Sequence, residues 1–266
     1  LDGADWFSET VDSSTQQMAH TSMALEPVAP YTPHIGYEQS TQDLTRRLMY
    51  ASWTPAGWVT ETVDSSANVG DYASLALEPS PPYTPHLSCY DLTNGGLKHA
   101  TWGGSGWVSE TVEDTGNVGK YTSLALAPTP PYTAHIAYFD VGNSALKFAW
   151  HTPSGWASET VDSAGYTGQF ASIALAHAPP YTPHISYQGE SESRFVLRHA
   201  MRAASGWVKE TVDDSGATVT AVQFTSLALE ATSPFTPHIG YYHFGDKSLK
   251  HAKLTSSGWV SETVES

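Results

Sequence analysis

Cysteine, positive charge and long apolar runs are scarce in this 266-residue chain, and each scarcity excludes a class of protein. The single cysteine, Cys89, excludes an internal disulfide, and its apolar strand context predicts a small buried side chain. Lysine and arginine number 12 against 27 acidic residues, so a net charge of −15 repels phosphate backbones and anionic lipid. No apolar run approaches the ~18 residues that span a bilayer. We therefore expect neither nucleic-acid binding nor membrane insertion.

Helical periodicity is also missing, which favours an all-β fold. Short segments rich in β-branched and aromatic residues alternate with clusters of Gly, Pro, Asn, Asp and Ser, the pattern of strands between turns. Hydrophobic residues make up 40 % of the chain and aromatic residues 12 %, which is enough to bury a substantial core.

What the chain does contain is one unit of roughly fifty residues, repeated five times. Its clearest marker is a tryptophan that recurs at intervals of 52, 49, 49, 51 and 52 residues. The six positions are Trp6, Trp58, Trp107, Trp156, Trp207 and Trp259. Each unit also holds three other strand-like segments, represented by 121–126, 183–187 and 249–252. Four strands per unit are typical of a propeller blade, so we predict a single five-bladed β-propeller of four-stranded antiparallel blades.

The units and their strands can be ordered from the sequence. We place the units at 4–56, 57–105, 106–154, 155–205 and 206–257, followed by a final outer strand at 258–266, all within one domain, 1–266. In each blade, the segment equivalent to 121–126 is expected to be innermost, and the tryptophan segment outermost. A ring of blades is expected to close, since closure removes exposed sheet edges.

Six tryptophan segments serve only five blades, so one terminal outer strand is spare. The spare copy is either 4–12 or 258–266, and the sequence favours neither. It is a remnant of repeat duplication, or an edge that pairs with another molecule and forms a homo-oligomer.

Spacings between equivalent residues distinguish the two faces of the ring. The inner-strand leucine and the second-strand histidine are nine residues apart in every unit, and the third-strand leucine and the next tryptophan are ten apart. The other two connections vary in length, and each reaches 14 residues once, from Val212 to Ser226 and from His34 to Leu48. One face is therefore expected to be repetitive, and the other to carry blade-specific loops.

Three strings resemble a known repeat: His-Ile-Ala-Tyr-Phe-Asp at 135–140, Leu-Lys-Phe-Ala at 146–149 and Gly-Trp-Val-Ser-Glu-Thr-Val at 106–112. They are similar to the repeats of large bacterial and archaeal secreted or cell-surface proteins, which are read as propeller blades. The resemblance covers essentially the whole chain and implies an extracellular or cell-surface location, but no agreed activity. The chain departs from the pattern at 82–85, where Pro-Tyr-Thr-Pro replaces the usual Asp-Gly turn.

The proline-rich link before each second strand holds the candidate ligand-binding residues. Proline stiffens the link, which lowers the entropy lost when a partner binds. An aromatic ring beside a hydroxyl suits the apolar face of a sugar ring or a protein surface. Alternatively, the ring folds back and plugs the blade edge. These residues are Tyr31, Tyr83, Tyr132, Tyr181, Phe235, Thr32, Thr84, Thr133, Thr182 and Thr236.

Other recurring residues are expected to be structural. The second-strand histidines lie too far apart to share a metal ion, so we expect each to hydrogen-bond to the inner-strand serine or to an indole of its blade. The tryptophans are expected to pack between blades, with sugar stacking as an alternative. The outer-strand glutamates and the third-strand histidines are expected to face solvent. These sets are His34, His86, His135, His184 and His238; Glu9, Glu61, Glu110, Glu159, Glu210 and Glu262; His99, His199 and His251.

These patterns favour a secreted or surface non-enzymatic binding module, lectin-like and multivalent, with a glycan or a surface protein as partner. No catalytic residue, metal or cofactor is predicted, since nucleophile elbows, phosphate loops and metal-ligand spacings are missing. One alternative is an architectural protein that assembles into filaments or a lattice by exchanging its spare terminal strand. A second is a glycosidase-like enzyme, since five-bladed propellers include lectins and glycosidases. Its candidate carboxylates are Asp91, Asp140 and Asp246.

Overall fold

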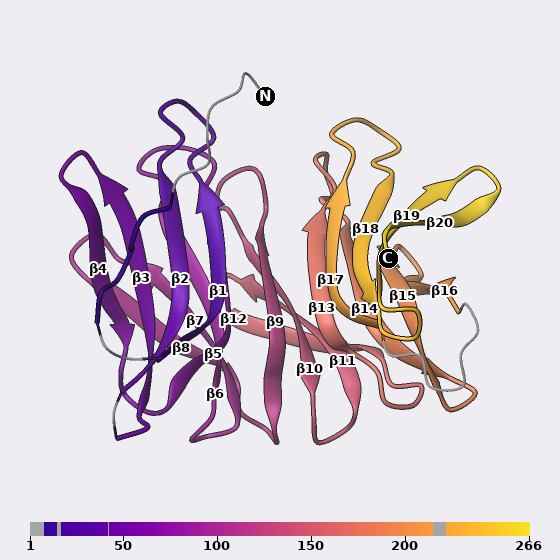
Figure 1. The fold of residues 1–266 in the computed structure, drawn as a ribbon, viewed down its shortest axis with the longest axis horizontal. Helices are drawn as coiled ribbons and strands as arrows, with labels where there is room; N and C mark the ends of the chain where they lie inside the picture. The colour runs from indigo at the N-terminus through magenta and orange to yellow at the C-terminus, as the bar shows by residue number, and fades with distance from the viewer. Residues whose placement is uncertain (1–7, 15–16, 42, 215–221) are drawn as a thin grey trace.

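The computed structural model describes residues 8–14, 17–41, 43–214 and 222–266, and these form twenty β-strands. The strands make five four-stranded antiparallel sheets that follow one another in chain order (Figure 1). Within the described ranges, no helix has the length and apolar character needed to cross a membrane. The predicted five-bladed β-propeller is confirmed.

The blades have the following strands. Blade 1 holds β1 (Gln17–Leu25), β2 (Pro33–Ser40), β3 (Arg46–Thr54) and β4 (Gly57–Asp64). Blade 2 holds β5 (Val69–Leu77), β6 (Pro85–Asp91), β7 (Gly96–Trp102) and β8 (Trp107–Glu113). Blade 3 holds β9 (Val118–Leu126), β10 (Ala134–Asp140), β11 (Ala145–Thr152) and β12 (Gly155–Asp162). Blade 4 holds β13 (Gln169–Leu175), β14 (Pro183–Ser191), β15 (Arg194–Ala203) and β16 (Gly206–Asp213). Blade 5 holds β17 (Val222–Leu229), β18 (Pro237–His243), β19 (Ser248–Thr255) and β20 (Gly258–Glu265).

The first strand of each blade is the innermost, as predicted, and consecutive inner strands pack together from β1 to β17. A serine hydroxyl joins each such pair. The amide of Leu124 in β9 donates to Ser74 Oγ of β5 at 3.0 Å, and equivalent bonds use Ser22, Ser123 and Ser172. The recurring Ser-Leu pair of the sequence therefore links neighbouring blades.

The hydrophobic core lies between blades. At the junction of blades 3 and 4, Leu146 and Phe148 pack against Ile173, Ile185 and Tyr187, and all five are buried. Cys89 is buried at the junction of blades 1 and 2, as predicted, and burial raises the pKa of its thiol to about 12. Each blade therefore depends on a neighbour to cover its apolar face.

The two ends of the chain differ from each other. The C-terminal tryptophan segment is β20, which pairs with β19 and completes blade 5. The spare copy is therefore N-terminal. Its Trp6 lies outside the described residues, and residues 8–14 form no strand but place Val11 against blade 1.

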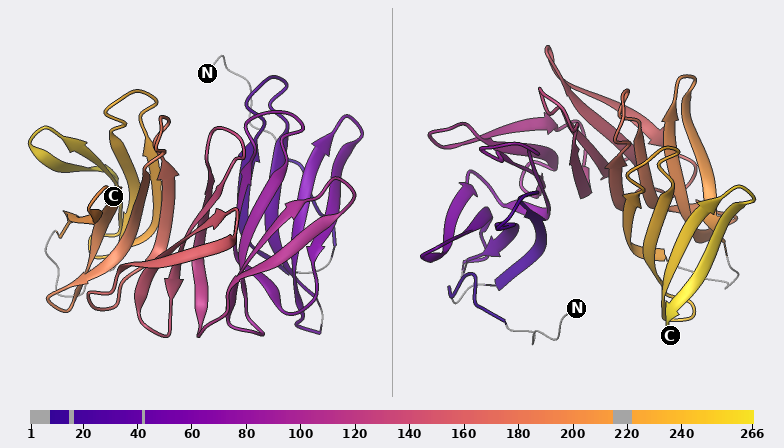
Figure 2. Two further views of the ribbon diagram at one scale, coloured as in Figure 1. Left: turned by 180° about the vertical axis from the view of Figure 1, so that it is seen from behind. Right: turned by 90° about the horizontal axis from the view of Figure 1, so that it is seen from above.

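The expected ring closure is not present in the described residues. Seen from above, the blades form an open arc whose two ends face each other across a gap (Figure 2). The inner strands β1 and β17 lack the packing that joins every other consecutive pair.

Candidate functional site

The five proline-rich links share one conformation. Each contains a cis X-Pro bond, and the aromatic residue after it has φ between 52° and 58°. In the fourth link, the Tyr181 amide donates to the Ala178 carbonyl at 2.8 Å, and the Thr182 carbonyl accepts from the Ala176 amide at 3.0 Å. These bonds recur in all five links, which explains the constant spacing of nine residues.

The aromatic rings of two links reach the preceding blade. The Tyr132 hydroxyl lies 2.5 Å from Ser80 Oγ, and the Tyr181 hydroxyl lies 2.9 Å from Thr129 Oγ1. Tyr181 and Thr182 line a cavity between blades 3 and 4, and Thr236 lines another between blades 4 and 5. The other seven predicted residues line neither cavity: Tyr31, Tyr83, Tyr132, Phe235, Thr32, Thr84 and Thr133.

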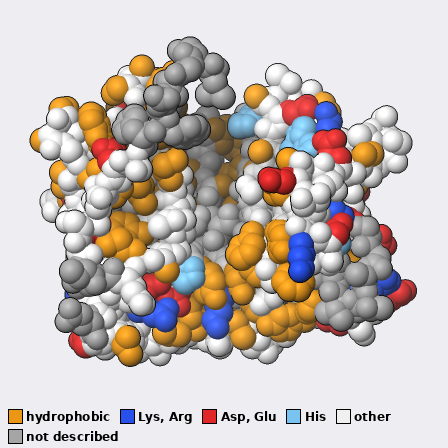
Figure 3. Space-filling view, viewed as in Figure 1, with side chains coloured by type: hydrophobic (Ala, Val, Ile, Leu, Met, Phe, Trp, Pro, Cys, Tyr) orange, Lys and Arg blue, Asp and Glu red, His pale blue; other side chains and the backbone are white. Residues whose placement is uncertain are grey.

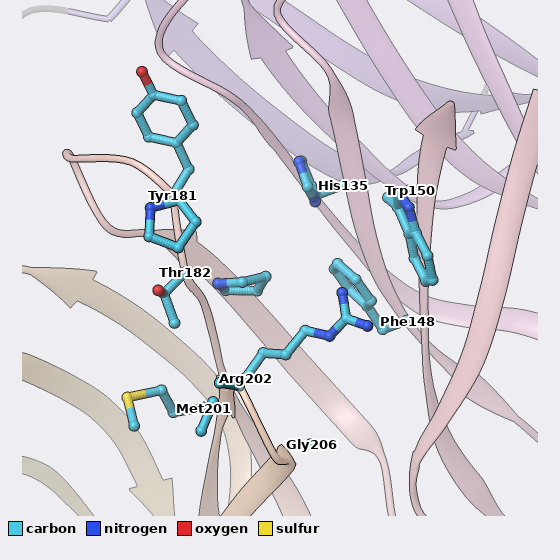
Figure 4. Close-up of a pocket in the computed structure, with 12 residues that line it drawn as sticks. His135, Phe148, Trp150, Tyr181, Thr182, Met201, Arg202 and Gly206 are labelled. Atoms are coloured by element: carbon cyan, nitrogen blue, oxygen red, sulfur yellow. The ribbon is translucent and has the colours of Figure 1, made fainter. Parts of the chain in front are cut away.

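The cavity between blades 3 and 4 has a volume of about 580 Å³ and opens on the face that carries the links (Figure 4). Blade 3 provides an aromatic side made of His135 from β10 and of Phe148 and Trp150 from β11. Phe148 stacks on Trp150 with ring centroids 5.4 Å apart and on His135 at 5.7 Å. Blade 4 provides the link at 180–183 and the β15–β16 turn.

Arg202, at the end of β15, is held across this cavity by partners from blade 3. Its Nε lies 3.1 Å and its Nη2 3.3 Å from the two carboxylate oxygens of Glu159 in β12. Its guanidinium carbon lies 5.1 Å from the Trp150 ring centroid. Glu159 also accepts a hydrogen bond from the Trp207 indole at 2.9 Å. The Arg202–Glu159 pair is therefore oriented by two tryptophans beside an open aromatic surface.

The side chains of this cavity differ from those at the equivalent positions of the other blades, although the backbone around it repeats. The position of Arg202 holds Trp53, Trp102, His151 and Leu254 in the other blades, and only blade 3 places a tryptophan at the position of Trp150. We expected blade-specific features on the face with variable loops, whereas this one lies on the repetitive face. The break of the repeat at Arg202 is visible in the sequence, but its contact with Glu159 of the preceding blade is not.

Four of the five second-strand histidines hydrogen-bond within their blades, but their partners differ from those predicted. They pair with the third strand, as in His86 Nδ1 to His99 Nε2 at 3.1 Å and His184 Nδ1 to His199 Nε2 at 3.0 Å. The serine that we expected as partner bonds to the next blade instead. His135 forms no such pair and stacks on Phe148. Burial, with the charge of Arg202 as a smaller cause, lowers its pKa to about 4, so its ring is uncharged at neutral pH.

One exposure prediction is wrong. The third-strand histidines His99 and His199 are buried because the neighbouring blade covers them. The prediction that the outer-strand glutamates face solvent is confirmed for Glu9, Glu110, Glu210 and Glu262, whereas Glu61 and Glu159 are half-buried. Three of the six also accept a hydrogen bond from the indole of the next blade at 2.9 to 3.0 Å: Glu61, Glu159 and Glu210. These bonds support the prediction that the tryptophans pack between blades.

The central channel carries a second aromatic group that the sequence analysis missed. One ring per inner strand stacks on the next, with centroids 4.6 to 5.1 Å apart, beside a cavity of about 340 Å³. The rings belong to His20, Tyr72, Tyr121, Phe170 and Phe224. They are tilted against each other, with interplanar angles of 39° to 52° among the first four rings.

One cluster near this channel has metal-ligand geometry. Single ligand atoms of His20, Glu38 and Asp71 all lie within 4.8 Å of one another. Arg46 pairs with both carboxylates, and its Nε lies 3.7 Å from Glu38. The arginine therefore compensates the negative charge that a cation would require.

Comparisons with known proteins show the fold. No protein-family model and no curated protein matches the chain. Among solved structures, an arginine-to-alanine triple mutant of AofleA from Arthrobotrys oligospora is similar, with 15 % identity, a TM-score of 0.63 and coverage of 94 % of this chain and 74 % of that one. The α-L-arabinofuranosidase Arb93A from Fusarium graminearum has 13 % identity and a TM-score of 0.59, covering 92 % and 80 %. The catalytic domain of the GH62 α-L-arabinofuranosidase from Coprinopsis cinerea has 13 % identity and a TM-score of 0.52, covering 88 % and 86 %.

Proposed function

We propose that this protein is a secreted or cell-surface, non-enzymatic glycan-binding propeller whose principal site is the cavity between blades 3 and 4. The observation that carries the proposal is the Arg202–Glu159 pair held beside the Trp150 ring. The ring offers an apolar face to the C–H groups of a sugar, and the ion pair offers donors and acceptors to adjacent hydroxyls. Tyr181 and Thr182 of the link form the rim of the site.

The charges of the site favour a neutral sugar residue. Arg202 and Glu159 compensate each other, and His135 is uncharged at neutral pH because burial lowers the pKa of its ring. The net charge of −15 on the whole chain also disfavours the approach of anionic glycans.

The fold is compatible with this proposal. Two of the similar solved structures are arabinofuranosidases, so propellers of this shape include proteins that act on glycans. That support is at the level of fold, and the same likeness is compatible with an enzyme. The choice between binding and hydrolysis must therefore be argued from the residues of the site and not from the fold.

The carboxylates named for a glycosidase have structural partners. Asp91 accepts the amides of Thr93 and Asn94 at 3.0 Å, and Asp140 accepts both the amide and the side chain of Asn143. Asp246 pairs with Lys250 at 3.0 Å. Because each carboxylate stabilises a turn or an ion pair, these contacts support a structural role for the three residues.

The test is a screen of neutral and acidic oligosaccharides, followed by calorimetry with the best ligand. We expect one neutral-sugar site per chain, no released sugar after prolonged incubation, and binding weakened at least about tenfold by Trp150→Thr or Arg202→Leu. Both variants use residues that the chain itself carries at equivalent positions, Thr101 and Leu254, so the blade should still fold.

The control is Trp53→Leu, which makes a comparable change at the position of Arg202 in blade 1. It should leave affinity unchanged. Absence of binding at millimolar ligand, or hydrolysis of the ligand, would overturn the proposed function. Equal loss of affinity in the control, or about five sites per chain, would instead overturn the placement in a single cavity and favour the repeated links.

A further inference from the structure

The two blades that border the gap expose faces that are buried at every other junction. Met23 in β1 is 63 % exposed, whereas its equivalents in the other inner strands are 6 to 8 % exposed. Leu249 in β19 is 46 % exposed, whereas its equivalents are 0 to 1 % exposed. The two sets of equivalents are Leu75, Leu124, Ile173 and Leu227, and Leu48, Leu97, Leu146 and Leu197. Figure 3 shows hydrophobic side chains on both sides of the hollow between the end blades.

A side-chain hydroxyl that accepts a hydrogen bond across every other junction has no described partner at the gap. The Ser226 hydroxyl of blade 5 has no bond among the described residues, whereas its four equivalents each accept an amide of the next blade. The indole bonds do not separate the gap from the other junctions, because Trp58 Nε1 of blade 1 and Trp156 Nε1 of blade 3 are both buried without a partner in the described part of the chain. The exposed faces and the Ser226 hydroxyl therefore make both ends halves of the same junction.

Residues 8–14 occupy part of the gap, in the place of an outer strand. Asp12 accepts the Tyr37 hydroxyl of blade 1 at 2.9 Å and the Gln39 amide at 3.0 Å. At the junction of blades 3 and 4, Asp162 at the end of β12 accepts the Tyr187 hydroxyl at 2.9 Å in the same way. The outer position beside blade 1 is thus filled, whereas the inner three positions have no occupant among the described residues.

We propose that the gap is a docking site for a three-stranded antiparallel β-unit with the inner, second and third strands of this repeat. Residues 8–14 would complete that unit as its outer segment. The unit would cover Leu249 on one side and Met23 on the other. One of its backbone amides would donate to Ser226 Oγ, as at the other four serines. The docked unit would make the same contacts with both end blades that consecutive blades already make at the four junctions of the chain.

A complete four-stranded blade fits the gap less well. Residues 261–265 of β20 repeat the sequence of 8–12 with one conservative change, so blade 5, from the same or a second copy, would compete with 8–14 for one place on blade 1. Closure of the arc on itself would also require the four tightly packed junctions to change their angles together.

The test appends a copy of residues 164–204, which contain β13, β14 and β15, after Ser266. We expect the extended chain to remain a monomer by light scattering and its melting temperature to rise by about 5 °C or more. Amide exchange over 17–25 and 248–255 should slow at least about tenfold, because both end faces become buried. Unchanged exchange at both ends of the extended chain would overturn the proposal.

Leu249→Asp provides the matched control, compared with Leu197→Asp at the equivalent buried position. In the unextended chain, Leu249→Asp should leave the melting temperature nearly unchanged, whereas Leu197→Asp should lower it strongly. In the extended chain, Leu249→Asp should cancel the rise in melting temperature that the added strands produce. If both substitutions are equally damaging without the extension, the Leu249 face is already covered and the proposal fails. Light scattering would then show whether a second copy or the chain itself covers it.

Discussion

At the scale of single residues, the second-strand histidine shows how one repeated position acquires different environments. His86 and His184 pair with a third-strand histidine, whereas His135 stacks on Phe148 because blade 3 has a phenylalanine there. Burial is the main cause that lowers the pKa of these rings, to about 3 for His86 and about 4 for His135 and His184. The third-strand His199 has its pKa lowered to about 3.

These histidines predict acid sensitivity in a defined pH range. Because an unfolded histidine has a pKa near 6.5, only the unfolded chain takes up these protons as the pH falls below that value. The free energy of unfolding should keep its full histidine contribution above pH 6.5 and decrease toward pH 4. The loss should be on the order of 1.4 kcal/mol per unit of pKa shift for each ring. Urea unfolding at pH 7, 5.5 and 4.5 measures the decline.

The carboxylates act in a separate range, which makes the histidine effect identifiable. Lys98 and Ser109 help to lower the pKa of Asp64 to about 2 against the opposing effect of burial, so its contribution is lost only below about pH 4. His199→Phe copies the residue of blade 3 and should make the decline shallower. A stability that stays constant from pH 7 to 4.5 would show that these rings titrate normally.

At the scale of elements, a glycine at the beginning of the inner strand lets consecutive blades approach closely. A Cβ at Gly168 would lie 2.7 Å from the Leu146 Cα of blade 3, and one at Gly119 would lie 2.8 Å from the Leu97 Cα of blade 2. Both residues also have φ above 100°. The inner strand therefore crosses the backbone of the preceding blade at a point where no side chain fits.

Alanine at Gly168 should therefore cost more than the same change at an open turn. Gly155 has a similar φ of +107°, but nothing lies within 4 Å of its added Cβ. We expect Gly155→Ala to cost about 1–3 kcal/mol from backbone strain alone, and Gly168→Ala to cost at least about 2 kcal/mol more. Equilibrium urea unfolding of both variants checks this. Equal costs would mean that the two backbones separate without penalty.

The strands could be predicted from the sequence, whereas contacts between blades could not. The tryptophan spacing and the segment at 121–126 were sufficient to predict the number of blades and the order of their strands. Arg202, Trp150 and Glu159 were not recognised as a site, because the first two lie in third strands and the last in an outer strand of adjacent blades. Their meeting depends on the packing of one blade on the next, which no local pattern encodes. For the same reason, the exposure of His99 was predicted wrongly.

At the scale of the whole molecule, the arc has two ends, and a sequence that repeats five times does not show them. Leu249 and Leu197 occupy the same place in the repeat, yet one is half exposed and the other is buried. Closure was expected because rings remove edges, but closure also depends on the angle at each junction. That angle is set by side-chain packing between blades, so the gap became visible only in the structure.

The stability of the chain should therefore fall from the middle of the arc toward both ends. Blade 3 is covered by neighbours on both faces, whereas blades 1 and 5 each leave one apolar face in water, and nearest-neighbour contacts dominate the stability of repeat arrays. We expect amides in β10 and β11 to exchange at least about a hundredfold more slowly than those in β1 and β19. Hydrogen–deuterium exchange followed by mass spectrometry measures the profile at peptide resolution. Uniform protection across all five blades would show that the ends are covered in solution, and a single weak end would show that only one of them is free.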